Sequence, residues 1–237
     1  MTQKWQTISF GALFLAVALL FPLLFSFAEA ALMAPTTAVG GTARPVIILD
    51  AGHGGEDGGA TGTNGVAEKE LNLQLTQALA ALLRLNGYDV IETRTEDRLL
   101  YGENVKKGHK KQEDLQNRLA FTEKYPDSVF ISIHMNTYPD QSCTGMQVWY
   151  SRNHAQSAEW ASAVQGAVTT LLQPDNHRKT KAASGNIYVL HHAQTPAILI
   201  ECGFLSTPSD CERLCDPNYR LELAMAIFSA IVQKNAR

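Results

Sequence analysis

The sequence alternates short runs of almost wholly apolar residues with longer segments whose apolar residues recur at helical spacing. Residues 45–50 (PVIILD), 128–134 (SVFISIH) and 197–201 (AILIE) lack the regular polar–apolar alternation of a strand that faces water on one side. They are typical of strands buried on both faces, and such a sheet must be covered by helices on both sides. This pattern predicts a single α/β domain with a mostly parallel, twisted sheet and helices on both faces.

Turn signals and helical periodicity set the expected order of elements. Residues 68–85 carry leucines at helical spacing and are followed by Asn86 and Gly87, which are typical of a helix C-terminus. We expect strands at residues 45–50, 88–93, 128–134, 146–150, 187–190 and 197–201. We expect helices at residues 68–85, 112–124, 157–172 and 218–232.

The first 43 residues differ in composition from the rest of the chain. Residues 8–27 carry no charge, follow Lys4 and precede Ala28-Glu29-Ala30, a small-x-small pattern typical of a signal-peptidase site. An apolar run of about 20 residues can also cross a bilayer. We therefore expect residues 1–30 to be a cleaved signal peptide or a retained membrane anchor, and residues 31–43 to be a linker. The domain at residues 44–237 would then be exported and work outside the cytoplasmic membrane.

Size, charge and cysteine content narrow the class of protein further. About 190 residues follow the linker, which is the size of one domain. The 20 Lys and Arg residues against 23 Asp and Glu residues give a net charge of −3, which argues against nucleic acid as a partner. The four cysteines lack the paired C-x-x-C spacing of a structural zinc site. A disulfide between Cys211 and Cys215 is compatible with export but is not required by the sequence.

Polar residues follow the predicted buried strands at the points where those strands end. His53 follows the first strand, His134 closes the third, Glu201 closes the last, and Glu68 opens the first helix after a glycine-rich loop. A single histidine after a strand is more often a hydrogen-bonded turn residue. Two histidines and a carboxylate form the ligand set of a catalytic zinc site, and a further glutamate can act as its base. The four residues together therefore favour a zinc hydrolase over packing alone.

Four sequence segments carry a resemblance to a known family. LDAGHGGEDGGATG, EKELNL, FISIHMN and PAILIECGFLS resemble, in their order and spacing, the zinc-dependent N-acetylmuramoyl-L-alanine amidases of bacterial cell walls. The likeness extends over about residues 46–232. It implies that His53, Glu68 and His134 bind one Zn²⁺ and that Glu201 is the catalytic glutamate. The family motif places the ligand at Glu68 and leaves Glu70 as a solvated helix charge.

The resemblance implies a substrate and a biological setting. The reaction would hydrolyse the amide between the lactyl group of N-acetylmuramic acid and the L-alanine of the peptidoglycan stem peptide. The bare catalytic domain behind a short N-terminal apolar segment looks most like the germination-specific amidases of spore formers, which act in muramic-lactam formation in the cortex. An accessory protein that helps to retain zinc is a further expected partner.

Other functions remain open at this point. One alternative is a vegetative wall amidase used in cell separation or turnover. Another is a membrane-tethered, non-catalytic wall-binding module, although all four motif positions are filled. A zinc peptidase or deacetylase that acts on another amide differs from these only in its substrate.

Each of several further residues allows two interpretations. Asn136 is a candidate substrate-binding residue or a turn cap, and Glu56 and Asp57 either orient an imidazole or are exposed turn acids. His191 and His192 are candidate metal ligands, but they stand where the family is variable. His109 lies in a lysine-rich loop that is either simply solvated or meets anionic wall polymer. The segment between Arg94 and Gln112 is longer than the family's common form.

Overall fold

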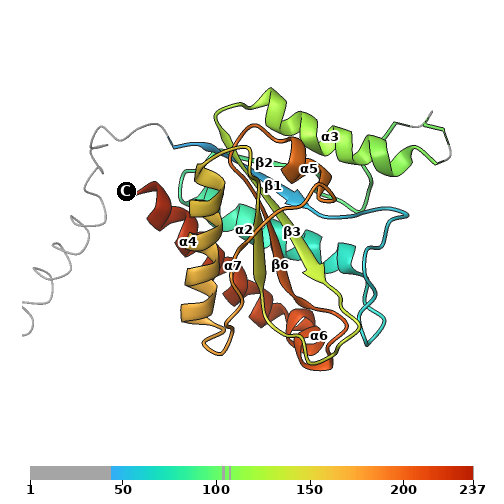
Figure 1. Ribbon diagram of the computed structural model, residues 1–237, viewed down its shortest axis with the longest axis vertical. Helices are drawn as coiled ribbons and strands as arrows, with labels where there is room; N and C mark the ends of the chain where they lie inside the picture. Colours follow the sequence, from blue (N-terminus) through green and yellow to red (C-terminus); the bar gives the residue numbers. More distant parts are fainter. Residues whose placement is uncertain (1–43, 103–104, 107, 237) are drawn as a thin grey trace, which may run out of the picture. The chain divides into compact units, whose positions relative to one another are not determined.

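The protein is described from a computed structural model, which defines residues 44–102, 105–106 and 108–236. These residues form a six-stranded sheet with the order β2-β1-β3-β6-β4-β5. Figure 1 labels the strands β2, β1, β3 and β6 of this sheet and the helices around it. The predicted membrane or signal segment and the predicted linker lie outside the described residues and stay predictions. Within the described residues, no helix is both long and apolar enough to cross a membrane.

The centre of the sheet is parallel, as predicted. β1 (Val46–Ala51) pairs in parallel with β2 (Val90–Glu92) and with β3 (Ser128–Asn136), and β3 pairs in parallel with β6 (Ala197–Phe204). β4 (Gln147–Tyr150) pairs antiparallel with β6. On its other side, β4 pairs in parallel with the two-residue edge strand β5 (Lys181–Ala182). The carboxyl ends of β1, β3 and β6 therefore meet at one edge of the sheet.

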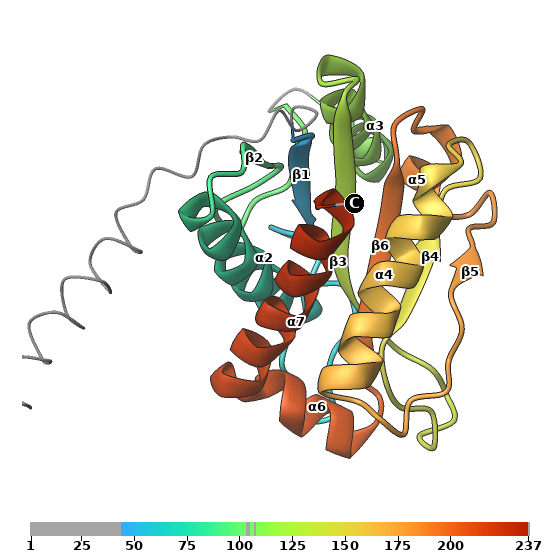
Figure 2. The same cartoon turned by 90° about the vertical axis from the view of Figure 1, so that its left-hand side faces the viewer.

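Helices cover both faces of this sheet, which confirms the predicted α/β class. α2 (Glu68–Leu85), α4 (Gln156–Leu171), α6 (Pro208–Cys215) and α7 (Pro217–Asn235) contribute to one core cluster, and α2, α4 and α7 lie together on that side of the sheet in Figure 2. α3 (Lys110–Lys124) and α5 (Tyr188–His192) cover part of the opposite face, over a smaller cluster that includes Phe130 and Leu199. Because α3 and α5 cover only part of this face, a site can form on it.

The helical spacing of the leucines in α2 explains how this helix packs against the sheet. Leu71, Leu75 and Leu79 are buried and face the larger cluster, whereas Leu85 at the end of the helix is exposed. The helix stops where Asn86 and Gly87 turn the chain, because Gly87 adopts a positive φ of 76° that other residues rarely reach.

One expected element is wrong, and two elements of the structure have no expected counterpart. Residues 187–190 were predicted as a strand, but Tyr188–His192 forms the short helix α5. A short apolar run has the same pattern in a buried strand and in a one-sided helical turn, and here Val189 and Leu190 bury one side of the turn against the sheet. The helix α6 and the strand β5 had no predicted counterpart.

Candidate metal centre

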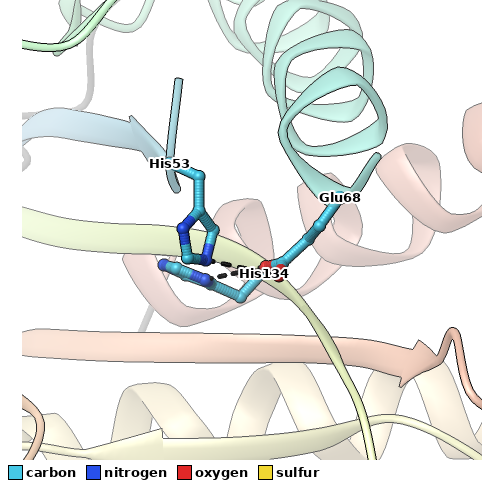
Figure 3. Close-up of side chains that lie close together, drawn as sticks. All are labelled: His53, Glu68 and His134. Atoms are coloured by element: carbon cyan, nitrogen blue, oxygen red, sulfur yellow. Dashed lines mark hydrogen bonds and ion pairs between the residues drawn. The ribbon is translucent and has the colours of Figure 1, made fainter. Parts of the chain in front are cut away.

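Three side chains from distant parts of the sequence converge at the carboxyl edge of the sheet. His53 follows β1, Glu68 opens α2, and His134 lies near the end of β3, and the three side chains point toward one another in Figure 3. The Glu68 Oε2 atom lies 3.3 Å from His53 Nε2, and Glu68 Oε1 lies 3.0 Å from His134 Nδ1. One candidate ligand atom from each residue fits within 4.8 Å of the others.

The Glu68 carboxylate is buried and fixed by several donors. The Ala60 amide donates to its Oε2 at 2.8 Å, and the Met135 amide and Asn72 Nδ2 donate to its Oε1 at 3.0 and 3.1 Å. Burial alone would raise the pKa of Glu68, but hydrogen bonds and charge from His134 and His53 hold that pKa well below its usual range. The carboxylate is therefore ionised and held in one orientation, as a metal ligand requires. Glu70, in contrast, is exposed, as expected for a solvated helix charge.

Asp57 orients the imidazole of His53. Its Oδ2 lies 2.9 Å from His53 Nδ1, so the Nε2 atom is the one turned toward Glu68. Burial lowers the pKa of His53, but the hydrogen bonds and negative charges of Glu68 and Asp57 outweigh it and raise that pKa to about 8. A carboxylate on the far nitrogen is the usual partner of a metal-binding histidine. The structure thus favours the orienting role of Asp57 over that of an exposed turn acid.

Glu201 lies beside this cluster on the neighbouring strand. It stands opposite His134 in the register between β6 and β3. Its Oε2 atom is shielded from solvent and has no hydrogen-bond partner in the described part of the chain. Burial and the charge of Glu68 raise the pKa of Glu201 to about 7, although His134 and His53 act against that rise. Such a carboxyl group is suited to exchange protons near neutral pH.

A cavity of about 240 Å³ opens beside these side chains. His134 and Glu201 line it together with Phe130 and Leu199 from the sheet, while α3 contributes Lys111 and α5 contributes Tyr188. Sequence reasoning missed the wall formed by α5, because residues 187–190 were expected to lie within the sheet. A hollow with both polar and apolar lining therefore lies next to Glu201.

The donor set matches the chemistry of zinc. Two imidazole nitrogens and one carboxylate oxygen are ligands that Zn²⁺ accepts in hydrolytic sites, where a further position stays open for water. The Oε2 atom of Glu201, beside the cluster, is an acceptor with no partner among the residues that the structure describes. The residues present therefore fit a single zinc ion held by His53, Glu68 and His134.

The other candidate ligands do not join the cluster. His191 and His192 are exposed on α5, their rings pack edge to face at 4.9 Å, and His192 Nδ1 hydrogen-bonds the Tyr188 carbonyl at 2.8 Å. Within the described residues, His53, Glu68 and His134 are the one group of three possible ligands found together. His109 is exposed and stands at the N-cap of α3.

Three further sequence hypotheses can be compared with the structure. The Asn136 side chain accepts a hydrogen bond from the Thr137 amide at 2.8 Å, which supports its role as a turn cap; its role in substrate binding stays a prediction. Glu56 pairs with Lys110 at 3.0 Å and is exposed. Cys211 and Cys215 are free thiols in this structure and contact the side chain of Asn64.

Comparisons with known proteins identify the family of this chain. A family model described as N-acetylmuramoyl-L-alanine amidase matches residues 47–233. The germination-specific N-acetylmuramoyl-L-alanine amidase of Bacillus subtilis is 35% identical over 189 residues, covering 79% of this chain and 78% of the relative. The sporulation-specific N-acetylmuramoyl-L-alanine amidase of the same organism is 31% identical over 191 residues, covering 79% and 67%.

Solved structures that are similar to this chain are also amidases. The CwlD amidase from Clostridioides difficile, in complex with the GerS lipoprotein, matches with a TM-score of 0.76 at 35% identity, covering 81% of this chain and 98% of that one. The amidase AmiC2 of Nostoc punctiforme matches with a TM-score of 0.71 at 27% identity, covering 83% and 100%. The family match and the shared fold define a hydrolase of the amidase class. The chain belongs to the N-acetylmuramoyl-L-alanine amidase family, which confirms the resemblance carried by the sequence motifs.

Proposed function

We propose that this protein is a zinc-dependent amidase that cleaves the bond between the lactyl group of N-acetylmuramic acid and L-alanine in peptidoglycan. The observation that carries the proposal is the convergence of His53, Glu68 and His134 beside Glu201, whose Oε2 atom is shielded from solvent. The family match supports the substrate and the amide that is cut. A non-catalytic wall-binding role is less well supported, because the proposed base and the complete ligand set are both present.

The chain's own residues divide the chemistry between them. Zinc bound by the two histidines and Glu68 would supply a Lewis acid that polarises the amide carbonyl and acidifies a water molecule. Glu201 accepts the proton of the attacking water and transfers it to the leaving amine nitrogen, so that a free L-alanine amino group departs. Asp57 keeps His53 Nε2 directed at the centre. The cavity lined by α3, α5 and the sheet lies beside the reacting groups.

Digestion of purified peptidoglycan tests this activity. The full chain, purified in detergent and supplied with zinc, is expected to release stem peptides that begin with free L-alanine, which mass spectrometry detects. Glu201→Gln is the matched control because it keeps the shape of the side chain and removes the base. Release of N-terminally blocked peptides, or release by the control at the wild-type rate, would contradict the proposal. A zinc peptidase would instead cut within the stem peptide, and a deacetylase would release acetate.

We infer that the biological setting is the spore cortex. The support comes from the germination-specific and sporulation-specific relatives, which are 35% and 31% identical to this chain. Deletion of the gene in its host is expected to leave cortex peptidoglycan without muramic-δ-lactam, as measured by muropeptide analysis of spores. The alternative is a vegetative wall amidase used in cell separation or turnover. In that case vegetative cells would show a separation or turnover defect and the cortex would be normal.

Export and an accessory partner complete the proposal. The uncharged run at residues 8–27 supports export, with residues 1–30 acting as a signal peptide or an anchor and residues 31–43 as a linker before the catalytic domain at 44–237. A relative solved in complex with the GerS lipoprotein supports an accessory lipoprotein for this chain. Cell fractionation with an antibody to the folded domain tests the first point. Co-purification from sporulating cells, with the zinc content measured with and without the partner, tests the second.

A further inference from the structure

Two buried arginines hydrogen-bond the backbone that carries His53. Arg94 follows β2 and is 1% exposed, and Arg118 lies in α3 and is 3% exposed. Between them they donate to the carbonyl oxygens of three consecutive residues: Ala51, Gly52 and His53. These carbonyls belong to the end of β1 and the turn that follows it, so the hydrogen bonds fix the point at which the chain leaves the sheet.

The geometry of these hydrogen bonds depends on the forked shape of each guanidinium group. Arg118 donates from Nη1 to the Ala51 carbonyl and from Nη2 to the His53 carbonyl, both at 2.9 Å. Arg94 donates from Nε to the Ala51 carbonyl at 2.9 Å and from Nη2 to the Gly52 carbonyl at 3.0 Å. A lysine carries a single ammonium group and cannot reproduce this planar arrangement.

The backbone held in this way is strained. His53 has a φ of 61°, which makes it the one non-glycine residue with a positive φ in the described part of the chain. A histidine in the left-handed region persists when its surroundings enforce that conformation. The residues on either side also have little freedom, because a Cβ at Gly52 would lie 2.3 Å from the His134 ring and a Cβ at Gly54 would lie 2.2 Å from the Arg98 carbonyl oxygen.

Arg118 also connects the turn to the strand that carries His134. It contacts Asp50 through Nη1 at 2.5 Å and Asp114 through Nε at 2.7 Å, so its charge is balanced inside the protein. The other oxygen of Asp50 accepts a hydrogen bond from Ser132 Oγ at 2.6 Å, two residues before His134 on β3. One guanidinium group thus fixes the position of β1 and its turn relative to β3.

We propose that Arg118, assisted by Arg94, is a positioning residue that holds His53 in its left-handed conformation and thereby presets the distance between His53 and Glu68 for metal binding. Neither arginine touches the candidate ligand atoms. Their effect passes through the backbone carbonyls of residues 51–53. The metal-binding part of this inference rests on the proposed zinc centre, whereas the backbone part does not.

The substitution Arg118→Lys keeps the positive charge of the side chain and removes the forked geometry of its hydrogen bonds. The lysine keeps a cation near Asp50 and Asp114 but loses the fork that reaches two carbonyls, so the fold is expected to remain while the turn loosens. We expect zinc affinity, measured by competition with a chromophoric chelator, to fall about 10- to 100-fold, the range seen when groups that orient metal ligands are removed. The visible spectrum of the cobalt-loaded full chain should also change shape, because it reports ligand geometry. Arg94→Lys should have a smaller effect, because Asn72 Nδ2 also donates to the Gly52 carbonyl, at 3.1 Å.

A matched control and a metal-free measurement make the test decisive. Leu119 lies next to Arg118 in α3 and packs on the smaller core cluster, so Leu119→Ala is expected to lower the melting temperature without changing zinc affinity or the cobalt spectrum. In the zinc-free protein, the amides of Gly54 and Asp57, which bond each other's carbonyls at 2.9 and 3.0 Å, report the turn. Their hydrogen exchange should be about tenfold faster in Arg118→Lys, relative to amides of β3, and unchanged in Leu119→Ala.

The outcomes separate this inference from the proposed function. Wild-type zinc affinity and wild-type exchange in Arg118→Lys would overturn the role of Arg118. Equal losses of zinc affinity in Arg118→Lys and Leu119→Ala would also overturn it, because they would indicate general destabilisation. If the wild-type chain bound no zinc, the proposed zinc centre and the metal-binding part of the inference would fail. The exchange of Gly54 and Asp57 would still decide whether the arginines hold the turn.

Discussion

At the scale of single residues, two carboxyl groups close together are given different properties by their surroundings. Glu68 receives two backbone amides and faces two imidazoles, so its pKa is held low and it suits a metal. Glu201 is half-buried as a residue, but its Oε2 is shielded from solvent and has no partner among the described residues, so the pKa of Glu201 rises to about 7 and it suits proton transfer. Environment, rather than residue type, therefore distinguishes the proposed ligand from the proposed base.

The role of Glu201 predicts that binding and turnover separate on substitution. In Glu201→Gln we expect kcat to fall on the order of 10²–10⁴-fold, as for loss of a general base. Zinc affinity should stay near the wild-type value, because Glu201 is not among the three proposed ligands. Isothermal titration with zinc and peptidoglycan digestion, run on the same preparation, measure both. Loss of zinc binding in this variant would instead make Glu201 a ligand.

The role of Asp57 predicts a weaker metal site when its charge is removed. Asp57→Asn weakens the hydrogen bond to His53 Nδ1, so zinc affinity is expected to fall about 10- to 100-fold. Glu56→Gln is the matched control, because Glu56 is adjacent, acidic and exposed, and contacts Lys110 rather than a histidine. Chelator competition compares the two variants. Equal losses in both would indicate that the net charge of the loop, and not the orientation of His53, controls affinity.

At the scale of elements, α2 both builds the core and presents Glu68 at its first residue. Leu79 is fully buried in this helix, so Leu79→Ala should lower the free energy of unfolding by about 2–5 kcal/mol. Leu85→Ala, at a position 84% exposed on the same helix, should change it by less than about 0.5 kcal/mol. Urea denaturation followed by circular dichroism measures both, and similar effects of the two substitutions would contradict the described packing of α2.

Elements with a distinctive local pattern were predictable from the sequence, and those without one were not. β1, β3 and β6 are apolar on both faces, and polar residues at their ends indicated where a site would form. Residues 187–190 were too few to distinguish a strand from a helical turn. Asp50 and Arg118 lie 68 positions apart in the sequence and meet only when α3 packs over β1, so no local pattern marked either as part of the site's support. For the same reason the conformation of His53 could not be foreseen.

At the scale of the whole molecule, the buried ion pairs beneath the site couple folding to pH. Burial raises the pKa of Asp50, but Arg118, Ser132 and Thr93 outweigh it and hold that pKa below its ordinary value. Asp114 and Arg94 also lie close by, and His134 contributes charge from β3. Asp50 joins α3, β1 and β3 through these contacts, so its protonation is expected to affect the cooperative unit as a whole.

The sign of this effect follows from linkage between protonation and folding. The unfolded chain takes up a proton at an Asp pKa of about 3.9, whereas folded Asp50 does so at a lower pH. The stabilisation from Asp50 is therefore fully present above the unfolded pKa and is lost as the pH falls toward and through the folded pKa. Urea unfolding from pH 6 to pH 3 should show stability decreasing below about pH 4–5 with a slope that approaches about 1.4 kcal/mol per pH unit for this one group. Asp127→Asn, which changes an exposed carboxylate, should preserve that slope, whereas Asp50→Asn should lower stability at pH 6 and flatten the slope. An unchanged slope in Asp50→Asn would assign the acid sensitivity to other carboxylates.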